Sequence, residues 1–283
     1  MTHTSLQAPI LPLPPGAIDC HAHVFGPFER FPLAEDRKYT PPQAPFENYL
    51  HMLDATGFAH GVLVHAGANG YDNRVTLDAL ARADGRLRGV AVPAPRATPS
   101  ELASMHAAGV RAIRFTETGT GKGNGVLDFS DLAQLAPHMR ELGWHAQIWA
   151  RCDRTVEAAE QLIGHGIPIV LDHMAYFDTE QGVGGEVFQR LLELMETGAF
   201  WVKMSALRNS KLFPTYDDVQ PFHHALVQVA PDRLIWGSDW PFIGLGEKTP
   251  TAAGLINLFD AWNDDTVVRR KIFVDNPTTL YGF

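Results

Sequence analysis

One pattern recurs along most of this chain: a short apolar run rich in Val and Ile, a turn, and a segment with helical periodicity. Eight such runs occur, at 17–24, 61–65, 87–93, 110–115, 145–150, 167–172, 200–205 and 234–237. Helical patterns lie between them, at 46–56, 75–83, 100–108, 132–142, 155–164, 187–196 and 219–229. Near-continuous apolar strands that alternate with helices are typical of a parallel sheet covered by helices. We therefore predict an α/β fold, and in particular a (β/α)8 TIM barrel.

The main alternative is an open, doubly wound sheet. No Gly-rich phosphate-binding fingerprint follows any of the apolar runs, so the usual reason to prefer that fold is missing. No linker, low-complexity tract or block of like charges divides the 283 residues. We expect one domain over 1–283, with residues 1–16 as a proline-containing arm.

Composition narrows the choice of partners. The chain has 23 Lys plus Arg against 32 Asp plus Glu, a net charge of −9, which argues against nucleic acid. Cys20 and Cys152 are the only cysteines and lie far apart, which suits a reducing cytoplasm. The N-terminus lacks the pattern of a signal peptide, and no stretch is apolar enough to span a bilayer. We expect a cytoplasmic protein, monomeric or homodimeric, that acts on a small molecule.

The first apolar run contains His21 and His23. Residues two apart in a strand point to the same face, so the two imidazoles converge. Such a pair can bind one metal ion or stabilise a developing oxyanion. Two polar residues at a strand end would be the plain alternative.

In (β/α)8 barrels the chemistry lies at the carboxyl ends of the strands. There the sequence places His65, Arg114, Trp149, His173, Arg208 and Asp239. His173 is placed to be a third imidazole. Asp239 stands between two tryptophans, where a buried carboxylate needs a partner or a function. The rim arginines could hold a substrate carboxylate, or Arg114 could form an ion pair with Glu117.

Three imidazoles and one carboxylate can catalyse hydrolysis in two ways. His21, His23, His173 and Asp239 could hold one divalent metal, most plausibly zinc, whose bound water is the nucleophile. Without a metal, Asp239 could take a proton from water while the histidines stabilise charge on the attacked carbonyl. The spacing does not choose between them.

Several segments resemble lactonases of the amidohydrolase superfamily, in the branch of 2-pyrone-4,6-dicarboxylate lactonases and sugar lactonases. The resemblance rests on Asp19 to Pro27, Lys38 to Pro41, Tyr71 to Asn73, Asp172 to Met174, Trp236 to Pro241 and Val274 to Pro277. It covers almost the whole chain. It implies a distorted barrel of the metal-dependent-hydrolase type, in which the residue matching Asp239 activates water for lactone hydrolysis. Some members of this branch need no metal and others carry one zinc ion.

The resemblance also implies substrate contacts. Tyr39, Arg114 and Arg208 fall on positions that hold substrate carboxylates in the pyrone lactonases, and we add His65, Trp149 and Tyr176 as candidates. Two family arginines are missing, because Thr120 and Tyr176 occupy their places. At about 1.5 to 3 kcal/mol for each charge-assisted contact, that loss disfavours a dicarboxylate, even if Lys122 compensates in part. We expect a lactone with one carboxylate or with hydroxyl groups.

Three other functions fit the same residues. A zinc-dependent decarboxylase of an aromatic or muconate acid would use the same metal ligands. A sugar-lactone isomerase would need the same base and the same carbonyl-stabilising groups. A barrel that binds a metabolite without turnover is the third.

Overall fold

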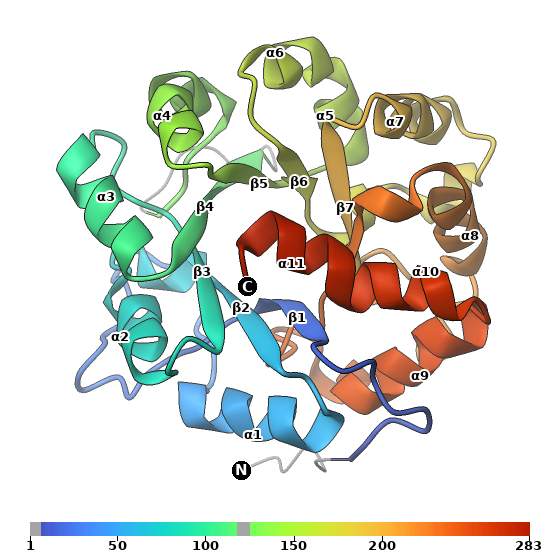
Figure 1. Ribbon diagram of the computed structural model, residues 1–283, viewed down its shortest axis with the longest axis horizontal. Helices are drawn as coiled ribbons and strands as arrows, with labels where there is room; N and C mark the ends of the chain where they lie inside the picture. The colour runs from blue at the N-terminus through green and yellow to red at the C-terminus, as the bar shows by residue number, and fades with distance from the viewer. Residues whose placement is uncertain (1–6, 118–124) are drawn as a thin grey trace.

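The computed structural model describes residues 7–117 and 125–283. Its eight strands form one parallel sheet whose spatial order is the order of the sequence (Figure 1). They are β1 (Ile18–Ala22), β2 (His60–Val64), β3 (Leu87–Ala91), β4 (Val110–Glu117), β5 (His145–Ala150), β6 (Ile169–Leu171), β7 (Phe200–Met204) and β8 (Leu234–Trp236). The predicted (β/α)8 barrel is confirmed.

Helices surround the sheet on the outside (Figure 1). They are α1 (Phe46–Thr56), α2 (Arg74–Arg82), α3 (Pro99–Ala107), α4 (Phe129–Glu141), α5 (Cys152–Glu157), α6 (Ala159–Gly164), α7 (Glu186–Glu196), α8 (Gln220–Val229), α9 (Ala252–Trp262), α10 (Thr266–Arg270) and α11 (Asn276–Tyr281). Their apolar faces pack on the strands in one large core that includes Leu53, Leu132 and Leu191. Burial of these faces drives the closure of the layer around the barrel.

The barrel is distorted where it closes. The register shifts between β1 and β2 and between β3 and β4. Strand β8 has only three residues, and the β1 side is joined to the chain beyond β8 by the bonds from His23 N to Trp240 O and from Asp239 N to His21 O, both 2.8 Å. Asp239 is therefore fixed by the closure itself.

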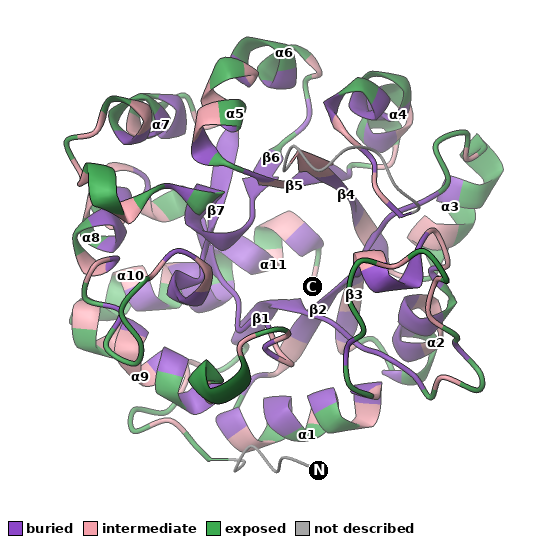
Figure 2. Cartoon of the chain, turned by 180° about the vertical axis from the view of Figure 1, so that it is seen from behind, coloured by how far each residue is buried: buried purple, intermediate pink, exposed green. Residues whose placement is uncertain are grey.

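The two ends of the barrel differ. Helix α11 crosses the end where the strands begin (Figure 1), and its Tyr281 packs on Ile18 and Val62. The turns at the other end face the viewer in Figure 2, where the strands are largely buried. No helix crosses that end in the described part of the chain, and the residues at the carboxyl ends of the strands lie there (Figure 2). The described part of the N-terminal arm lies on the outer helices, since Arg269 donates to the carbonyls of Leu11 and Pro12.

The main differences from the prediction are one split helix, one shortened strand and the helices α9, α10 and α11 after β8, which were not predicted. The helix predicted at 155–164 is split at Ala158, which ends α5 and begins α6. Neither Gly nor Pro marks that break, so the sequence carried no signal for it. The strand predicted at 167–172 is only β6, because Pro168 has no N–H to donate and Asp172 already begins a turn. Within the described residues, no helix is both long and apolar enough to cross a bilayer.

Candidate active site

The side chains of His21, His23, His173 and Asp239 meet at the carboxyl ends of the strands. The Nε2 atoms of His21 and His23 are 3.3 Å apart. Asp239 Oδ1 lies 3.7 Å from the first and 3.5 Å from the second. The rings of His21 and His173 have centroids 4.8 Å apart. The structure thus brings together four groups from β1 and from the turns after β6 and β8, and all four are buried.

Unusual backbone conformations present two of these groups. His173, Met174, Ala175 and Tyr176 have φ between 48° and 62°, and Asp239 has φ 62°. The left-handed region costs an L-residue about 1 to 2 kcal/mol. Four successive residues in it form a tight left-handed turn, which Met174 and Ala175 anchor by being buried in the core. Strain of this kind persists where the surrounding structure holds it, and it is common at functional sites.

The imidazoles of His21, in β1, and of His23, just after β1, each have their second nitrogen engaged. His23 Nδ1 donates to the carbonyl oxygen of Val64 over 2.7 Å, so in the neutral ring its Nε2 is an acceptor. His21 Nδ1 lies 3.3 Å from Asp172 Oδ1. Burial, followed by the charge of Lys203, holds the pKa of His21 well below its usual value. Burial also lowers the pKa of His173 to about 4, so the imidazoles of His21 and His173 are neutral near pH 7.

Asp239 is a buried carboxylate with a cationic partner. Both Nε and the Nη2 atom of Arg208 lie 2.6 Å from its Oδ2. Burial by itself raises the pKa of Asp239, but the nearby His173 and His23 side chains and the Arg208 guanidinium together hold it well below its usual value. Asp239 is therefore ionised, with Oδ2 held by Arg208 and Oδ1 facing the histidines.

Arg114 does not pair with Glu117, the partner first considered from the sequence. Residues three apart on a strand point to opposite faces, so the two side chains of β4 diverge. Arg114 instead reaches Asp172 Oδ2 with Nε at 3.2 Å and Nη2 at 3.1 Å. Its guanidinium also lies 5.2 Å from the centre of the Trp149 ring. Arg114 therefore lies inside the site, and its positive charge is partly balanced by the carboxylate of Asp172.

The remaining residues predicted to contact substrate differ in how far they are buried. His65 is buried, and its Nε2 binds the carbonyl oxygen of Gly70 over 2.7 Å, which fixes the turn after β2. Trp149 lies beside His173, with 6.4 Å between the ring centroids. Tyr39 and Tyr176 are each 39% exposed. Burial raises the pKa of the Tyr39 hydroxyl, although the charges of Arg114 and Arg208 lower it. Thr120 and Lys122 lie outside the described residues.

A second group of buried polar residues was missed from the sequence. Lys203 in β7 is fully buried, and its Nζ donates to Gln147 Oε1 over 2.6 Å. The same Nζ lies 3.3 Å from Asp172 Oδ1 and 3.3 Å from His21 Nδ1. The signal was present as a lysine in an otherwise apolar strand, Phe200 to Met204. A charge in such a run is rare unless it is paired.

The site fits a divalent metal. His21, His23 and Asp239 form one group whose ligand atoms lie close enough to share an ion, and His21, Asp172 and His173 form another. Two nitrogens at 2.0 to 2.1 Å from a tetrahedral zinc ion are about 3.3 Å apart, which matches the 3.3 Å between the two Nε2 atoms. His173 belongs to the second group, so the four predicted ligands do not form one compact set.

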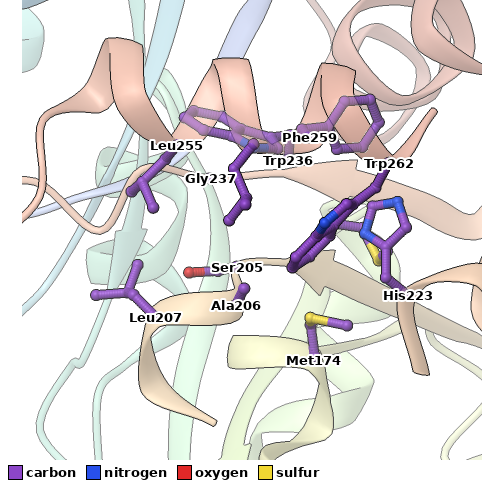
Figure 3. Close-up of a pocket in the computed structure, with 12 residues that line it drawn as sticks. Met174, Ser205, Ala206, Leu207, His223, Trp236, Gly237, Leu255, Phe259 and Trp262 are labelled. Atoms are coloured by element: carbon purple, nitrogen blue, oxygen red, sulfur yellow. The ribbon is translucent and has the colours of Figure 1, made fainter. Parts of the chain in front are cut away.

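A small, partly open recess lies beside the site (Figure 3). Its walls are mostly apolar and come from the turns after β6 and β7, from β8 and from α8 and α9: Met174, Met204, Ser205, Ala206, Leu207, His223, Trp236, Gly237, Leu255, Leu258, Phe259 and Trp262. The side chains that meet around Asp239 do not line it, and we give the recess no part in the chemistry.

Fold and site together define a class: a (β/α)8 barrel with a buried cluster of imidazoles and a carboxylate at the ends of β1, β6 and β8, where such barrels carry their chemistry. The sequence model of the amidohydrolase family matches residues 18–283. The chain therefore belongs to the amidohydrolase family, and the resemblance predicted from the motifs is confirmed.

Individual relatives match over nearly their full length. The chain is 40% identical over 280 residues to a 4-sulfomuconolactone hydrolase of Rhizobium radiobacter, covering 98% of this chain and 93% of that protein. It is 35% identical to a 2-pyrone-4,6-dicarboxylate hydrolase of Comamonas testosteroni, covering 96% and 92%. A crystal structure from Pseudomonas putida, assigned as a 2-pyrone-4,6-dicarboxylic acid hydrolase, superposes with a TM-score of 0.84 at 31% identity, covering 95% and 98%.

Proposed function

We propose that this protein is a hydrolase that opens the ring of a lactone by cleaving its ester bond. The observation that carries the proposal is the state of Asp239, a buried, ionised carboxylate with one oxygen held by Arg208 and the other facing His21 and His23. The relatives add support, since two of them are named for the hydrolysis of a muconolactone and of a pyrone. They favour lactone hydrolysis over the decarboxylase alternative.

In the proposed reaction, Asp239 accepts a proton from water as the water oxygen bonds to the lactone carbonyl carbon. The negative charge that develops on the carbonyl oxygen is stabilised by imidazole N–H groups of the site, including that of His173. The ring C–O bond then breaks, and the leaving alkoxide takes the proton from Asp239. The products are a carboxylic acid, which releases its proton to solvent as a carboxylate, and a hydroxyl on the same open chain.

The charges around the histidines indicate the substrate. Arg114, Lys203 and Arg208 supply three positive charges, and Asp172 and Asp239 supply two negative ones, so 3 − 2 leaves +1. That balance suits a lactone with one anionic group better than a dianion. Buried polar atoms without a partner among the described residues add neutral hydrogen-bonding groups, in particular Trp149 Nε1 and His173 Nδ1. We propose a singly charged lactone, with Tyr39, His65 and Tyr176 as further contacts.

The proposal does not require a metal. Zinc, where bound, would be held by His21, His23 and Asp239 and would lower the pKa of a bound water. His23 is prepared for that role because its Nδ1 is held by a backbone carbonyl. We further propose that residues 1–283 form one domain and that the protein is cytoplasmic, as its two free, buried cysteines suggest.

The test is Asp239→Asn, assayed for kcat/KM on a panel of lactones that carry zero, one or two carboxylates. We expect a loss of about 10³-fold, because the amide cannot accept the proton from water. Asp232→Asn is the matched control, since Asp232 pairs with Lys271 at the surface. Wild-type turnover by Asp239→Asn would refute the assigned base. Equal turnover of mono- and dicarboxylates would refute the substrate class.

A further inference from the structure

The proposed reaction does not use Lys203, although its ammonium is fully buried in the middle of the barrel. Its Nζ is surrounded by groups from three other parts of the sheet. Gln147 Oε1 from β5 accepts its hydrogen bond at 2.6 Å, Asp172 Oδ1 after β6 lies at 3.3 Å, and His21 Nδ1 from β1 lies at 3.3 Å. Burying a charge is costly unless it is paired, so the placement needs an explanation.

Lys203 and Asp172 compete for the same ring nitrogen. Lys203 can only donate to His21 Nδ1, while the carboxylate Asp172 can only accept from it. If Nδ1 accepts from Lys203, the ring proton of neutral His21 must lie on Nε2. If Nδ1 donates to Asp172, Nε2 carries no proton. The choice between these two partners therefore sets the tautomer of His21.

The tautomer matters because of His23. In the neutral ring of His23 the proton lies on Nδ1, which donates to the carbonyl oxygen of Val64, so His23 Nε2 is an acceptor. It lies 3.3 Å from His21 Nε2. A proton on His21 Nε2 makes this contact a hydrogen bond. Without that proton two lone pairs face each other, which is unfavourable unless a cation lies between them.

We propose that Lys203 is a positioning residue that holds His21 in the Nε2–H tautomer and thereby weakens the binding of a divalent metal at His21 and His23. Its positive charge beside the His21 ring acts in the same direction, since it repels a second cation. Asp172 acts in the opposite direction, because a carboxylate on the far nitrogen makes an imidazole a better ligand. The inference rests on the proposed function in one respect only: it assumes that His21 and His23 belong to the active site.

The first test measures zinc binding without substrate. Lys203→Met has a similar length and no donor, so His21 Nδ1 is free to donate to Asp172. We expect the Kd for Zn²⁺, measured by competition with a chromophoric chelator, to fall at least tenfold. Lys271→Met is the matched control, because it removes a lysine that is ion-paired to Asp232 at the surface. A Kd for Lys203→Met within threefold of the wild type would overturn the proposal.

The second test does not depend on the folding of a variant. Nitrogen-15 spectra of the imidazoles in metal-free wild-type protein report which ring nitrogen of His21 carries the proton. We expect Nε2–H, and a proton on Nδ1 would overturn the proposal. Neither measurement uses a lactone, so a lack of lactone hydrolysis would refute the proposed function while leaving this inference to stand or fall on its own data.

Discussion

At the scale of single residues, the ionisation state of Asp239 is set by the side chains around it. A carboxyl group in this buried position would be protonated more easily, but His173, His23 and Arg208 reverse that tendency and lower its pKa. The same guanidinium occupies Oδ2 and also donates to the carbonyl oxygen of Ile243. Arg208 therefore both ionises the proposed base and fixes its orientation.

Arg208→Met should shift the acidic limb of the pH profile. Without the guanidinium, the pKa of Asp239 rises toward its usual value, so less of the base is ionised at low pH. The acidic limb of kcat/KM should then move to higher pH, measured between about pH 2.5 and pH 7. Arg190→Met, which removes a surface arginine paired with Glu193, serves as control. An unmoved limb would mean that Arg208 does not tune the base.

At the scale of elements, the histidine pair is positioned by the close approach of β1 and β8 where the barrel closes. Gly237 follows β8, and a Cβ atom there would lie 2.6 Å from His21 Cβ and 3.1 Å from His21 N. Both atoms belong to a buried strand that cannot move away without disturbing His23. The left-handed turn at 173–176 also positions a histidine, because the packing of Met174 and Ala175 in the core holds the geometry of the turn that carries His173.

Gly237→Ala should lower activity by more than the addition of one methyl group suggests. The added methyl must push β1 and the β8 turn apart, and misplacement of catalytic groups by about 1 Å can cost about 10²-fold in rate. Gly164→Ala is the control, because a Cβ at this position in α6 meets nothing within 4 Å. The comparison needs kcat/KM together with urea unfolding. Full activity of Gly237→Ala would show that the closure tolerates the methyl group.

At the scale of the whole molecule, closure of the barrel depends on one buried carboxylate. Asp19 accepts from the backbone N of Ser238 at 2.8 Å and from its Oγ at 2.6 Å, and also from Tyr49 Oη at 3.1 Å. Burial raises its pKa to about 6, in spite of these donors. These bonds tie β1, α1 and the chain beyond β8 together, where β8 is too short to do so alone.

Asp19→Asn should loosen the whole barrel. The amide leaves at least one buried donor without an acceptor, which costs about 1 to 3 kcal/mol in the free energy of unfolding. Urea denaturation measures the cost, and hydrogen exchange at His23 and Trp240 should locate it at the closure. Asp54→Asn, which breaks a surface pair with Arg86, should cost no more than about 0.5 kcal/mol. Equal losses in the two variants would contradict this role.

The sequence alone determined the order of the eight strands and the barrel class, although it did not indicate helices α9, α10 and α11 after β8. It also indicated the four candidate groups, which are His21, His23, His173 and Asp239. These follow from local patterns: apolar runs give strands, helical spacing gives helices, and the strand-end rule of (β/α)8 barrels selects the site. The missed break at Ala158 shows the limit of such patterns, since no residue type marks it.

Only the tertiary structure decided which groups face each other. Arg114 pairs with Asp172 rather than Glu117, Arg208 pairs with Asp239, and Lys203 lies against His21. Each of these contacts joins side chains from different strands or strand-end turns, and its energy depends on burial and on distances of a few ångströms that no local pattern encodes. Candidate residues of the site can thus be named from the sequence, while their contacts, charge states and proton positions depend on the closed barrel.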